Sequence, residues 1–384
     1  MTNRIYLDNA ATTAVSPEVL REMEPCWTEC WGNPSSIHGT GREARRALDL
    51  ARKRTAAAIG AQPQEIYFTS GGSESDNWAL QGAAAARRDR GRHIITTAVE
   101  HHAVLHTCRA LEAQGYEVTY LPVDRLGRVS PESVEAALRE DTILISVMTA
   151  NNEIGTIQPV REIGEIAHRH GVLFHTDAVQ AIGAVKVDVN EMNADMLSLS
   201  AHKFHGPKGV GALYVRRGTK LAPLIHGGAQ ERGLRAGTEN VPGIVGLGKA
   251  IEMASENIPE RSARIAALRD RLIRGVLTRI PDAVLNGDPE NRLPGNASFT
   301  FPGVDGEALL LRLDLMGIAC SGGSACTSGS TEPSHVLAAI GQPPELSRGS
   351  LRMTLSDTNT EAEIDETLAV LPGLVEDLRR MSVR

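Results

Sequence analysis

The first two thirds of the chain alternate between short apolar runs and longer segments with helical spacing. Between residues 64 and 216, each apolar run is followed by a polar or glycine-rich break and then by a helical period. The apolar runs predict strands at residues 66–69, 93–99, 118–123, 142–148, 172–174, 196–199 and 210–215. Strands that alternate with helices form a mostly parallel sheet with helices on both faces. Such sheets bind ligands at the carboxyl ends of their strands.

The pattern changes in the last third of the chain. Residues 260–279 predict a long, arginine-rich amphipathic helix. Beyond it, the pattern predicts two more strands and two more helices, at residues 297–301, 306–315, 350–355 and 361–380. We therefore expect an α/β chain with a large domain over residues 15–258. Residues 1–14 and 259–384 are expected to form a smaller α+β domain.

Composition narrows the class of protein. The 384 residues are enough for one large core or two unequal domains, and the net charge is −7. This acidic balance gives no support for a nucleic-acid or anionic-membrane partner. The apolar runs are too short to span a membrane, and the first residues lack a signal-peptide pattern. Five irregularly spaced cysteines fit a reducing compartment, so we expect a cytoplasmic protein.

Polar clusters follow three successive predicted strands. These clusters contain Asn152, Asp177 and Lys203, respectively. If the three strands are neighbours, an amide, a carboxylate and an amine converge on one crevice. An aldehyde cofactor with a pyridine ring needs a lysine for a Schiff base and an aspartate that keeps the ring nitrogen protonated. The sequence therefore makes a cofactor of this class a candidate.

A phosphate site is expected beside such a cofactor. Residues 70–74, with Gly72 and Ser73 at their centre, lie between a predicted strand and a predicted helix. Free backbone N–H groups and the positive end of the helix would face an anion there. Because Gly-Gly-Ser turns also serve as plain connectors, this prediction depends on the Asp177 and Lys203 strand ends.

Each of these residues also has a structural interpretation. Lys203 could be a solvated surface lysine, and Lys208 is its closest competitor, which we interpret as a loop charge. Asp177 could cap the N-terminus of a following helix. The sequence leaves these alternatives open.

Cys326 is a candidate nucleophile. It lies in a run of glycine and serine, whereas structural cysteines usually pack inside apolar elements. A thiol in such a loop is expected to be exposed and mobile, as a nucleophile requires. By contrast, Cys108 and Cys320 follow or lie within apolar segments, and we expect both to be buried.

Two groups of residues superficially resemble metal sites. Cys26 and Cys30 are spaced for one helix face, but no second pair completes a zinc site. His101, His102 and His106 lack the His-Glu-x-x-His arrangement. We therefore expect no intrinsic metal ion.

Seven motifs together resemble the NifS/IscS-type pyridoxal-phosphate cysteine desulfurases, in class V of the fold-type I aminotransferase superfamily. They lie at residues 6–13, 32–36, 100–101, 151–155, 200–203, 235–240 and 323–328. The similarity runs over essentially the whole chain. The Gly-Ser-Ala-Cys-Thr-Ser motif, which contains Cys326, separates this branch from ordinary aminotransferases.

The resemblance implies roles for individual residues. Lys203 would form the Schiff base with pyridoxal 5′-phosphate, Asp177 would pair with its ring nitrogen, and His101 would stack on the ring and assist proton transfer. Further cofactor contacts are implied for Gly72, Ser73, Asn152, Gln180, Ser200, His202 and, from the second subunit of a homodimer, Thr238. Asn33, Asn152 and Arg352 would bind the substrate, since a guanidinium grips a carboxylate with two parallel bonds. Alternatively, Arg352 is a surface arginine on an edge strand.

The resemblance also implies an activity. L-cysteine would become L-alanine, and its sulfur would remain as a persulfide on Cys326 before passing to an iron–sulfur scaffold or another acceptor protein. An iron–sulfur cluster could be bound transiently through Cys326. Two other readings stay open: a selenocysteine lyase or other pyridoxal-phosphate enzyme of the same fold, and a non-enzymatic metal-binding protein that uses Cys26, Cys30 and the histidines.

Overall fold

The computed structural model describes residues 4–323 and 334–382, and Cys326 lies outside the described residues. In this part of the chain, a seven-stranded sheet has the order β2-β8-β7-β6-β5-β3-β4. Its strands are β2 (Ile66–Thr69), β3 (His93–Thr97), β4 (Glu117–Leu121), β5 (Thr142–Ser146), β6 (Leu173–Asp177), β7 (Met196–Ser200) and β8 (Gly211–Val215). Strand β8 runs antiparallel to both of its neighbours, and the remaining neighbouring pairs are parallel. The mostly parallel sheet predicted from the sequence is confirmed.

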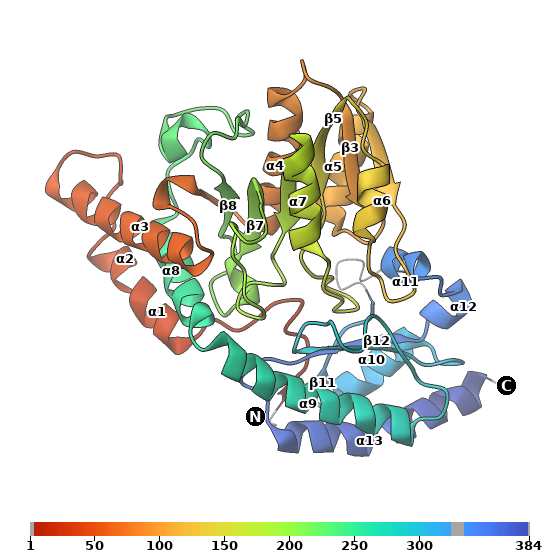
Figure 1. Cartoon of the computed structure of the whole chain (residues 1–384). Coiled ribbons are helices and arrows are strands. Elements are labelled where there is room, and N and C mark those ends of the chain that lie inside the picture. Colours follow the sequence, from red (N-terminus) through yellow and green to blue (C-terminus); the bar gives the residue numbers. More distant parts are fainter. Residues whose placement is uncertain (1–3, 324–333, 383–384) are drawn as a thin grey trace.

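Helices cover both faces of this sheet (Figure 1). On one face, α4 (Gly72–Ala86) and α5 (His102–Glu112) pack on Leu173 and its neighbours. On the other face, α3 (Gly39–Ala58), α7 (Val160–His170) and α8 (Val241–Ser255) pack on Phe174 and its neighbours. Successive strand residues point to opposite faces, which explains why Leu173 and Phe174 belong to different cores. The remaining helices of this half are α1 (Pro17–Met23), α2 (Pro25–Thr28) and α6 (Pro131–Ala136).

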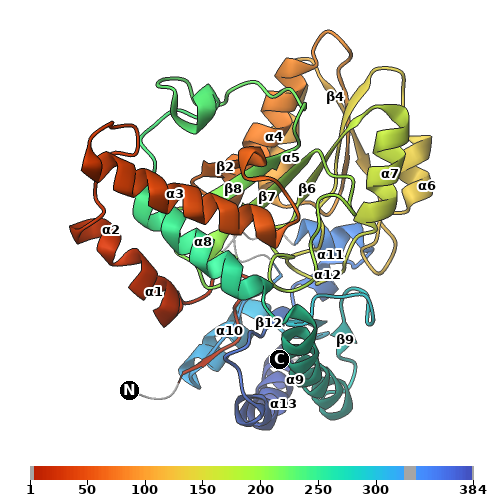
Figure 2. The same ribbon diagram turned by 60° about the vertical axis from the view of Figure 1, so that its left-hand side comes forward.

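A second core is built mainly from the C-terminal third (Figure 2). Its antiparallel sheet has the order β12-β10-β9, formed by β12 (Ser350–Thr354), β10 (Asn296–Thr300) and β9 (Val284–Leu285). The helices α9 (Ile258–Arg279), α10 (Gly306–Leu315) and α13 (Glu361–Ser382) contribute apolar residues to the same core. The N-terminal strand β1 (Ile5–Tyr6) pairs with β11 (Ile318–Ala319), and Leu7 is buried in this core. The domain boundaries themselves stay a prediction.

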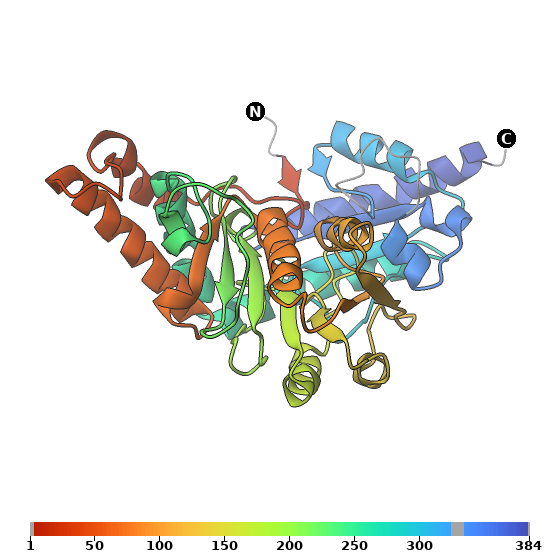
Figure 3. The same ribbon diagram turned by 90° about the horizontal axis from the view of Figure 1, so that it is seen from above.

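The large sheet and the C-terminal half lie on either side of the segments that follow β6 and β7 (Figure 1). Figure 3 shows the molecule from above, with the C-terminal half in blue beside the large sheet. The short helices α11 (His335–Ala339) and α12 (Pro344–Ser347) complete the C-terminal half. A cleft of about 690 Å³ between the halves is lined by residues that include Gln180, Lys203 and Thr354. Among the described residues, no helix combines the length and the apolar character needed to cross a bilayer.

Candidate active site

The three polar clusters predicted at strand ends come together, because β5, β6 and β7 are adjacent. Asp177 is the last residue of β6, and Lys203 ends the 3₁₀ turn η2 (Ala201–Lys203) directly after β7. Asn152 lies in the turn after β5. Neighbouring parallel strands end at the same edge of a sheet, so the adjacency of the three strands brings the side chains that follow them to one crevice.

Asp177 is a buried carboxylate at this edge, with 7% of its surface exposed. Its Oδ1 accepts the N–H of Val179 at 2.9 Å, which is the turn-capping contact that the sequence left open. Burial raises the pKa of Asp177 to about 6, against the opposing effects of the Val179 N–H and Lys203. A positively charged group that binds here would favour the ionised carboxylate. Capping the turn and receiving a cation are therefore compatible roles of one side chain.

Lys203 is held beneath the N-terminal segment of the chain. Its Nζ donates to the carbonyl oxygens of Ala10 at 2.5 Å and Ala11 at 2.8 Å. The backbone of this segment is fixed in turn, since the N–H of Thr13 donates to the carbonyl oxygen of His202 at 2.9 Å. Lys208, its competitor in the sequence, is exposed. The structure thus favours Lys203 as the amine of the site.

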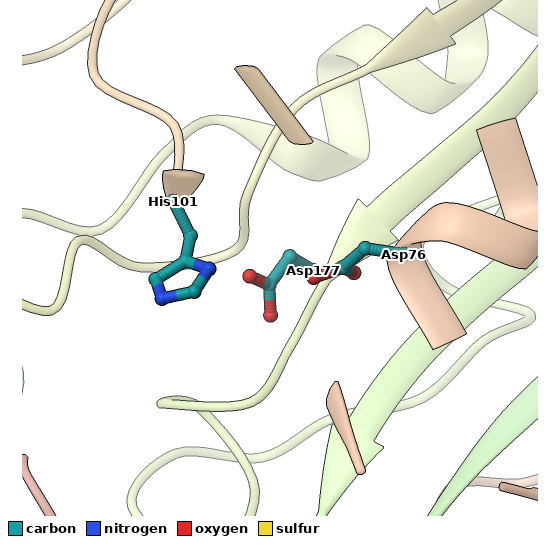
Figure 4. A group of neighbouring side chains, drawn as sticks. All are labelled: Asp76, His101 and Asp177. Atoms are coloured by element: carbon teal, nitrogen blue, oxygen red, sulfur yellow. The ribbon is translucent and has the colours of Figure 1, made fainter. Parts of the chain in front are cut away.

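His101 faces Asp177 from the other side of the crevice (Figure 4). It caps the N-terminus of α5, and its Nδ1 accepts the N–H of Ala103 at 3.1 Å. Burial lowers the pKa of His101 to about 4, with further lowering by the nearby Lys203, His102 and His106. The imidazole is therefore neutral at pH 7. Because Nδ1 accepts a hydrogen bond, its proton belongs on Nε2.

The predicted phosphate loop forms the start of α4. Gly72 is the first helical residue, and the N–H groups of this first turn have no carbonyl of their own helix to bind. A Cβ at Gly72 would lie 2.8 Å from Cγ2 of Val179, so glycine permits the close approach of α4 to the turn after Asp177. Ser73 is exposed in the same turn, and Ser200 lies buried at the end of β7. These groups form a set of donors suited to an anion.

An ion pair neutralises the one acidic residue in this loop. Glu74 accepts from Nε of Arg235 at 2.8 Å and from Nη2 at 3.0 Å, and it also accepts the N–H of Ser70 at 2.8 Å. Burial acts to raise the pKa of Glu74, but Arg235 and Ser70 outweigh it and lower the pKa. The same arginine fixes the segment that carries Thr238 next to the loop.

Two predicted cofactor contacts bind the N-terminal segment. Nε2 of Gln180 donates to the carbonyl oxygen of Ala10 at 3.0 Å. Nδ1 of His202 lies 3.1 Å from Oγ1 of Thr12. Burial lowers the pKa of His202 to about 4, helped by Lys203 and Lys208, so this ring is neutral at pH 7.

Arg352 reaches the crevice from β12, in the other half of the molecule. Only 1% of its surface is exposed, so the alternative of a surface arginine is wrong. Its Nη1 donates to the carbonyl oxygen of Asn152 at 2.9 Å, and its Nη2 donates to Oδ1 of Asp8 at 3.2 Å. Its Nε is buried without a partner among the described residues. A buried guanidinium with an unused donor is suited to a carboxylate ligand.

Asn33 and Thr238 are not brought into this group. Asn33 is exposed in the loop between α2 and α3, where its Oδ1 accepts the N–H of Ser35 at 2.9 Å. Thr238 is exposed after the 3₁₀ segment η3 (Gln230–Gly233). In the described ranges, no hydrogen bond joins either residue to Asp177 or Arg352. Their roles stay predictions.

Sequence reasoning missed four buried polar residues that surround the crevice: Asp76, Glu100, His175 and Ser198. Glu100 entered only as part of a motif, yet it accepts from Oγ1 of Thr97 at 2.7 Å and from the N–H of Met148 at 3.0 Å. Burial raises its pKa to about 8. Such residues could be found in the sequence as polar residues at positions where the pattern of a strand or helix predicts a buried apolar side chain.

The cysteines in the described ranges are poor nucleophiles. Burial raises the pKa of Cys26 to about 11, and that of Cys30 is also raised. Cys108 is buried as predicted, whereas Cys320 is only half-buried. Burial raises the pKa of Cys320 to about 12. All four thiols are therefore protonated at neutral pH, which leaves Cys326 as the candidate nucleophile.

In the described part of the chain, Asp76, His101 and Asp177 are of residue types that can bind a metal ion, and their ligand atoms lie within 4.8 Å of one another (Figure 4). The same crevice holds an amine and a helix start that favours anions. A buried carboxylate for a ring nitrogen, an amine for an aldehyde and donors for a phosphate match the parts of pyridoxal 5′-phosphate. The residues present fit this cofactor.

Comparisons with known proteins agree with this geometry. Residues 5–367 match the family model "Aminotransferase class-V". The chain is 59% identical to the cysteine desulfurase IscS of Methanosarcina thermophila, over 98% of this chain and 93% of that protein. A solved NifS-like protein superposes with a TM-score of 0.92 at 43% identity, over 98% of this chain and all of that one. A structure titled "SspA in complex with cysteine" gives a TM-score of 0.82 at 41% identity, over 93% of this chain and all of that one. The chain therefore belongs to the class-V aminotransferase family, as a pyridoxal-phosphate-dependent cysteine desulfurase of the NifS/IscS type.

Proposed function

We propose that the chain converts L-cysteine to L-alanine and retains the sulfur as a persulfide on Cys326. The observation that carries the proposal is that Lys203 lies near Asp177 at adjacent strand ends, while the buried Arg352 donates to Asn152 after the next strand. Bound pyridoxal phosphate supplies an electron sink for the charge that develops at the substrate Cα. The chain itself must bind the amino acid, move the protons and receive the sulfur.

Arg352 binds the substrate carboxylate in this proposal. Its guanidinium already spans two oxygen atoms, one on Asn152 and one on Asp8. A carboxylate has two oxygens in one plane and can take two parallel bonds from the same fork. The substrate would displace the Asp8 carboxylate, whose side chain is 18% exposed and can turn toward water.

Lys203 has two roles, as the covalent attachment for the cofactor and then as the base for the Cα proton. Both roles need a neutral amine at Nζ, which a lysine supplies when its pKa is lowered and an arginine does not. The carbonyl oxygens of Ala10 and Ala11 hold Nζ in place without adding a charge. His101 keeps its proton on Nε2 while Nδ1 accepts from Ala103, so it acts first as a proton donor at Nε2.

The sulfur step takes place at Cys326. Its thiolate attacks the sulfur of cysteine, so that an S–S bond forms as the C–S bond breaks. The electron pair of the broken bond stays on the three-carbon fragment, which leaves as alanine after protonation. The remaining cofactor contacts, from Gly72, Ser73, Asn152, Gln180, Ser200 and His202, would hold the cofactor in place during this exchange.

We further propose a cytoplasmic homodimer that passes sulfur to an iron–sulfur scaffold or to another acceptor protein, with a cluster bound transiently through Cys326. Similarity to the cysteine desulfurase IscS of Methanosarcina thermophila supports the sulfur-transfer part of this proposal. The exposure of Thr238 supports its contribution to the site of a second copy, and Asn33 is proposed to bind the substrate carboxylate.

The test compares Cys326→Ala with Cys320→Ala. We expect Cys326→Ala to bind the cofactor normally but to produce no alanine or sulfide from L-cysteine. Cys320→Ala should retain activity, since its thiol is protonated and half-buried. Full activity of Cys326→Ala on cysteine would refute the persulfide step. Activity of that variant on selenocysteine alone would favour the selenocysteine lyase.

A further inference from the structure

A row of polar side chains occupies the face of the sheet beneath α4. Leu173 and Met196 pack against α4 in the apolar part of this face. Two residues further along each strand, the same face carries His175 on β6 and Ser198 on β7. All side chains at these positions are buried. The face therefore changes from apolar to polar as the strands approach Asp177.

Asp76 comes to this row from α4. It lies on the sheet-facing side of the helix, together with Ala79, Leu80 and Ala83, at helical spacing. Only 1% of its surface is exposed, and its Oδ1 has no hydrogen-bond partner among the described residues. Its carboxyl group lies within 4.8 Å of Asp177 (Figure 4). Two buried carboxyl groups therefore stand side by side, and the reaction uses one.

Among the described residues, no positively charged side chain of the sheet contacts Asp76. His175 is the closest basic group, with Nε2 3.7 Å from Oδ1 of Asp76. Its Nδ1 lies 2.9 Å from Oγ of Ser146, and its Nε2 lies 3.0 Å from Oγ of Ser198. Burial lowers the pKa of His175 to about 3, so these bonds are made by a neutral ring. His175 thus fixes the positions of Ser146 and Ser198 by hydrogen bonds but supplies no positive charge to Asp76.

The same environment acts differently on the two carboxyl groups. Burial and the adjacent Asp177 raise the pKa of Asp76 well above its usual range, although Ser198 hydrogen-bonds to it. Asp177 has the N–H of Val179 and the charge of Lys203 in its favour. Two carboxylates this close cannot both ionise in a buried site without a cation for each. The proton of the pair therefore belongs on Asp76.

We propose that Asp76 is a positioning residue that stays a neutral carboxylic acid beside Asp177, so that the negative charge of the pair resides on Asp177. This inference rests on the proposed role of Asp177 at the ring nitrogen of the cofactor. If Asp76 held the charge instead, Asp177 would be protonated and could not keep that nitrogen positive. A neutral Asp76 fills the space behind Asp177 and fixes its position without competing for the cation.

The first test is infrared spectroscopy of the wild-type holoenzyme with ¹³C-labelled aspartate at pH 8. A protonated carboxyl group has a C=O stretching band separate from that of carboxylates, and the label moves only aspartate bands. We expect one label-sensitive acid band, which disappears in Asp76→Asn and persists in the control Asp314→Asn, whose side chain is 59% exposed. Absence of the band from the wild type, or its persistence in Asp76→Asn, would overturn the proposal.

The second test measures cofactor binding. An amide has the shape of a neutral carboxylic acid, so we expect the apoenzyme of Asp76→Asn to bind pyridoxal phosphate within about threefold of the wild-type Kd. Asp177→Asn should weaken binding and change the absorbance of the bound cofactor. A loss in Asp76→Asn as large as that in Asp177→Asn would show that Asp76 carries charge. Neither the infrared spectrum nor the binding titration requires catalytic turnover. The inference about Asp76 can therefore be tested even if the chain does not desulfurate cysteine.

Discussion

Arg352→Lys tests how the crevice recognises its substrate. The guanidinium makes two bonds to oxygen, of 2.9 Å from Nη1 to Asn152 and 3.2 Å from Nη2 to Asp8. Once Asp8 is displaced, Nη2 and Nε, which has no partner among the described residues, are available to a carboxylate. Lysine keeps the positive charge but presents it as one ammonium group, so one of the two parallel bonds to the substrate is lost. A hydrogen bond to a charged group contributes ~1.5–3 kcal/mol. The affinity for L-cysteine should therefore fall roughly tenfold to one-hundredfold.

The assay compares L-cysteine with cysteamine, which has the same thiol and amine but no carboxylate. We expect KM for L-cysteine to rise in Arg352→Lys while the inhibition constant of cysteamine stays unchanged. Arg348→Lys is the matched control, since Arg348 is exposed four residues earlier in the chain. Cofactor absorbance and thermal unfolding report whether the variant is folded and loaded. An equal loss for both ligands, or no loss for cysteine, would refute the assignment of Arg352 to the carboxylate.

Three further predictions concern the cofactor and stability. Lys203→Ala should lose the absorbance of the covalently bound cofactor, and an unchanged spectrum would contradict the assignment. Arg235→Gln should weaken pyridoxal-phosphate binding to the apoenzyme about fivefold, ~1 kcal/mol, because the charge of Glu74 is no longer neutralised; unchanged binding in a titration would count against the phosphate loop. Glu100 binds a proton in the folded state up to about pH 8 but in the unfolded state only to about pH 4.5. The wild type should therefore lose stability relative to Glu100→Gln as pH rises between these values, with a slope approaching ~1.4 kcal/mol per pH unit in urea unfolding; parallel curves would refute the burial argument.

The sequence predicts the large sheet well, because its strands are apolar on both faces and lie between helical periods. It misses the end of β6, since His175, Thr176 and Asp177 are polar residues that continue a buried strand. Because polar residues after a short apolar run are typical of a loop, the sequence places these three residues outside the strand. Polar side chains inside a sheet are stable only where hydrogen bonds satisfy them, and that pairing is not visible along the chain.

The crevice itself is predicted only in part. The convergence of Lys203 and Asp177 is predicted on the condition that their strands are neighbours, and the observed strand order meets this condition. The proximity of Asp76 to Asp177 is not predicted, because it depends on which face of α4 packs against the sheet. The resemblance assigns Arg352 to the substrate, whereas the local pattern also allows a surface arginine on an edge strand, and β12 does lie at the edge of its sheet. Its burial arises from the packing of the two halves of the molecule against each other, which a local pattern does not encode.

A single-turnover experiment tests the central claim most directly. The purified enzyme, loaded with pyridoxal phosphate, is mixed with one equivalent of L-cysteine without an acceptor or reductant, and alanine is measured alongside the mass of the peptide that contains Cys326. We expect one alanine for each sulfur atom added to that peptide. Alanine formation with no added sulfur on Cys326, or with the sulfur on Cys320 instead, would contradict it.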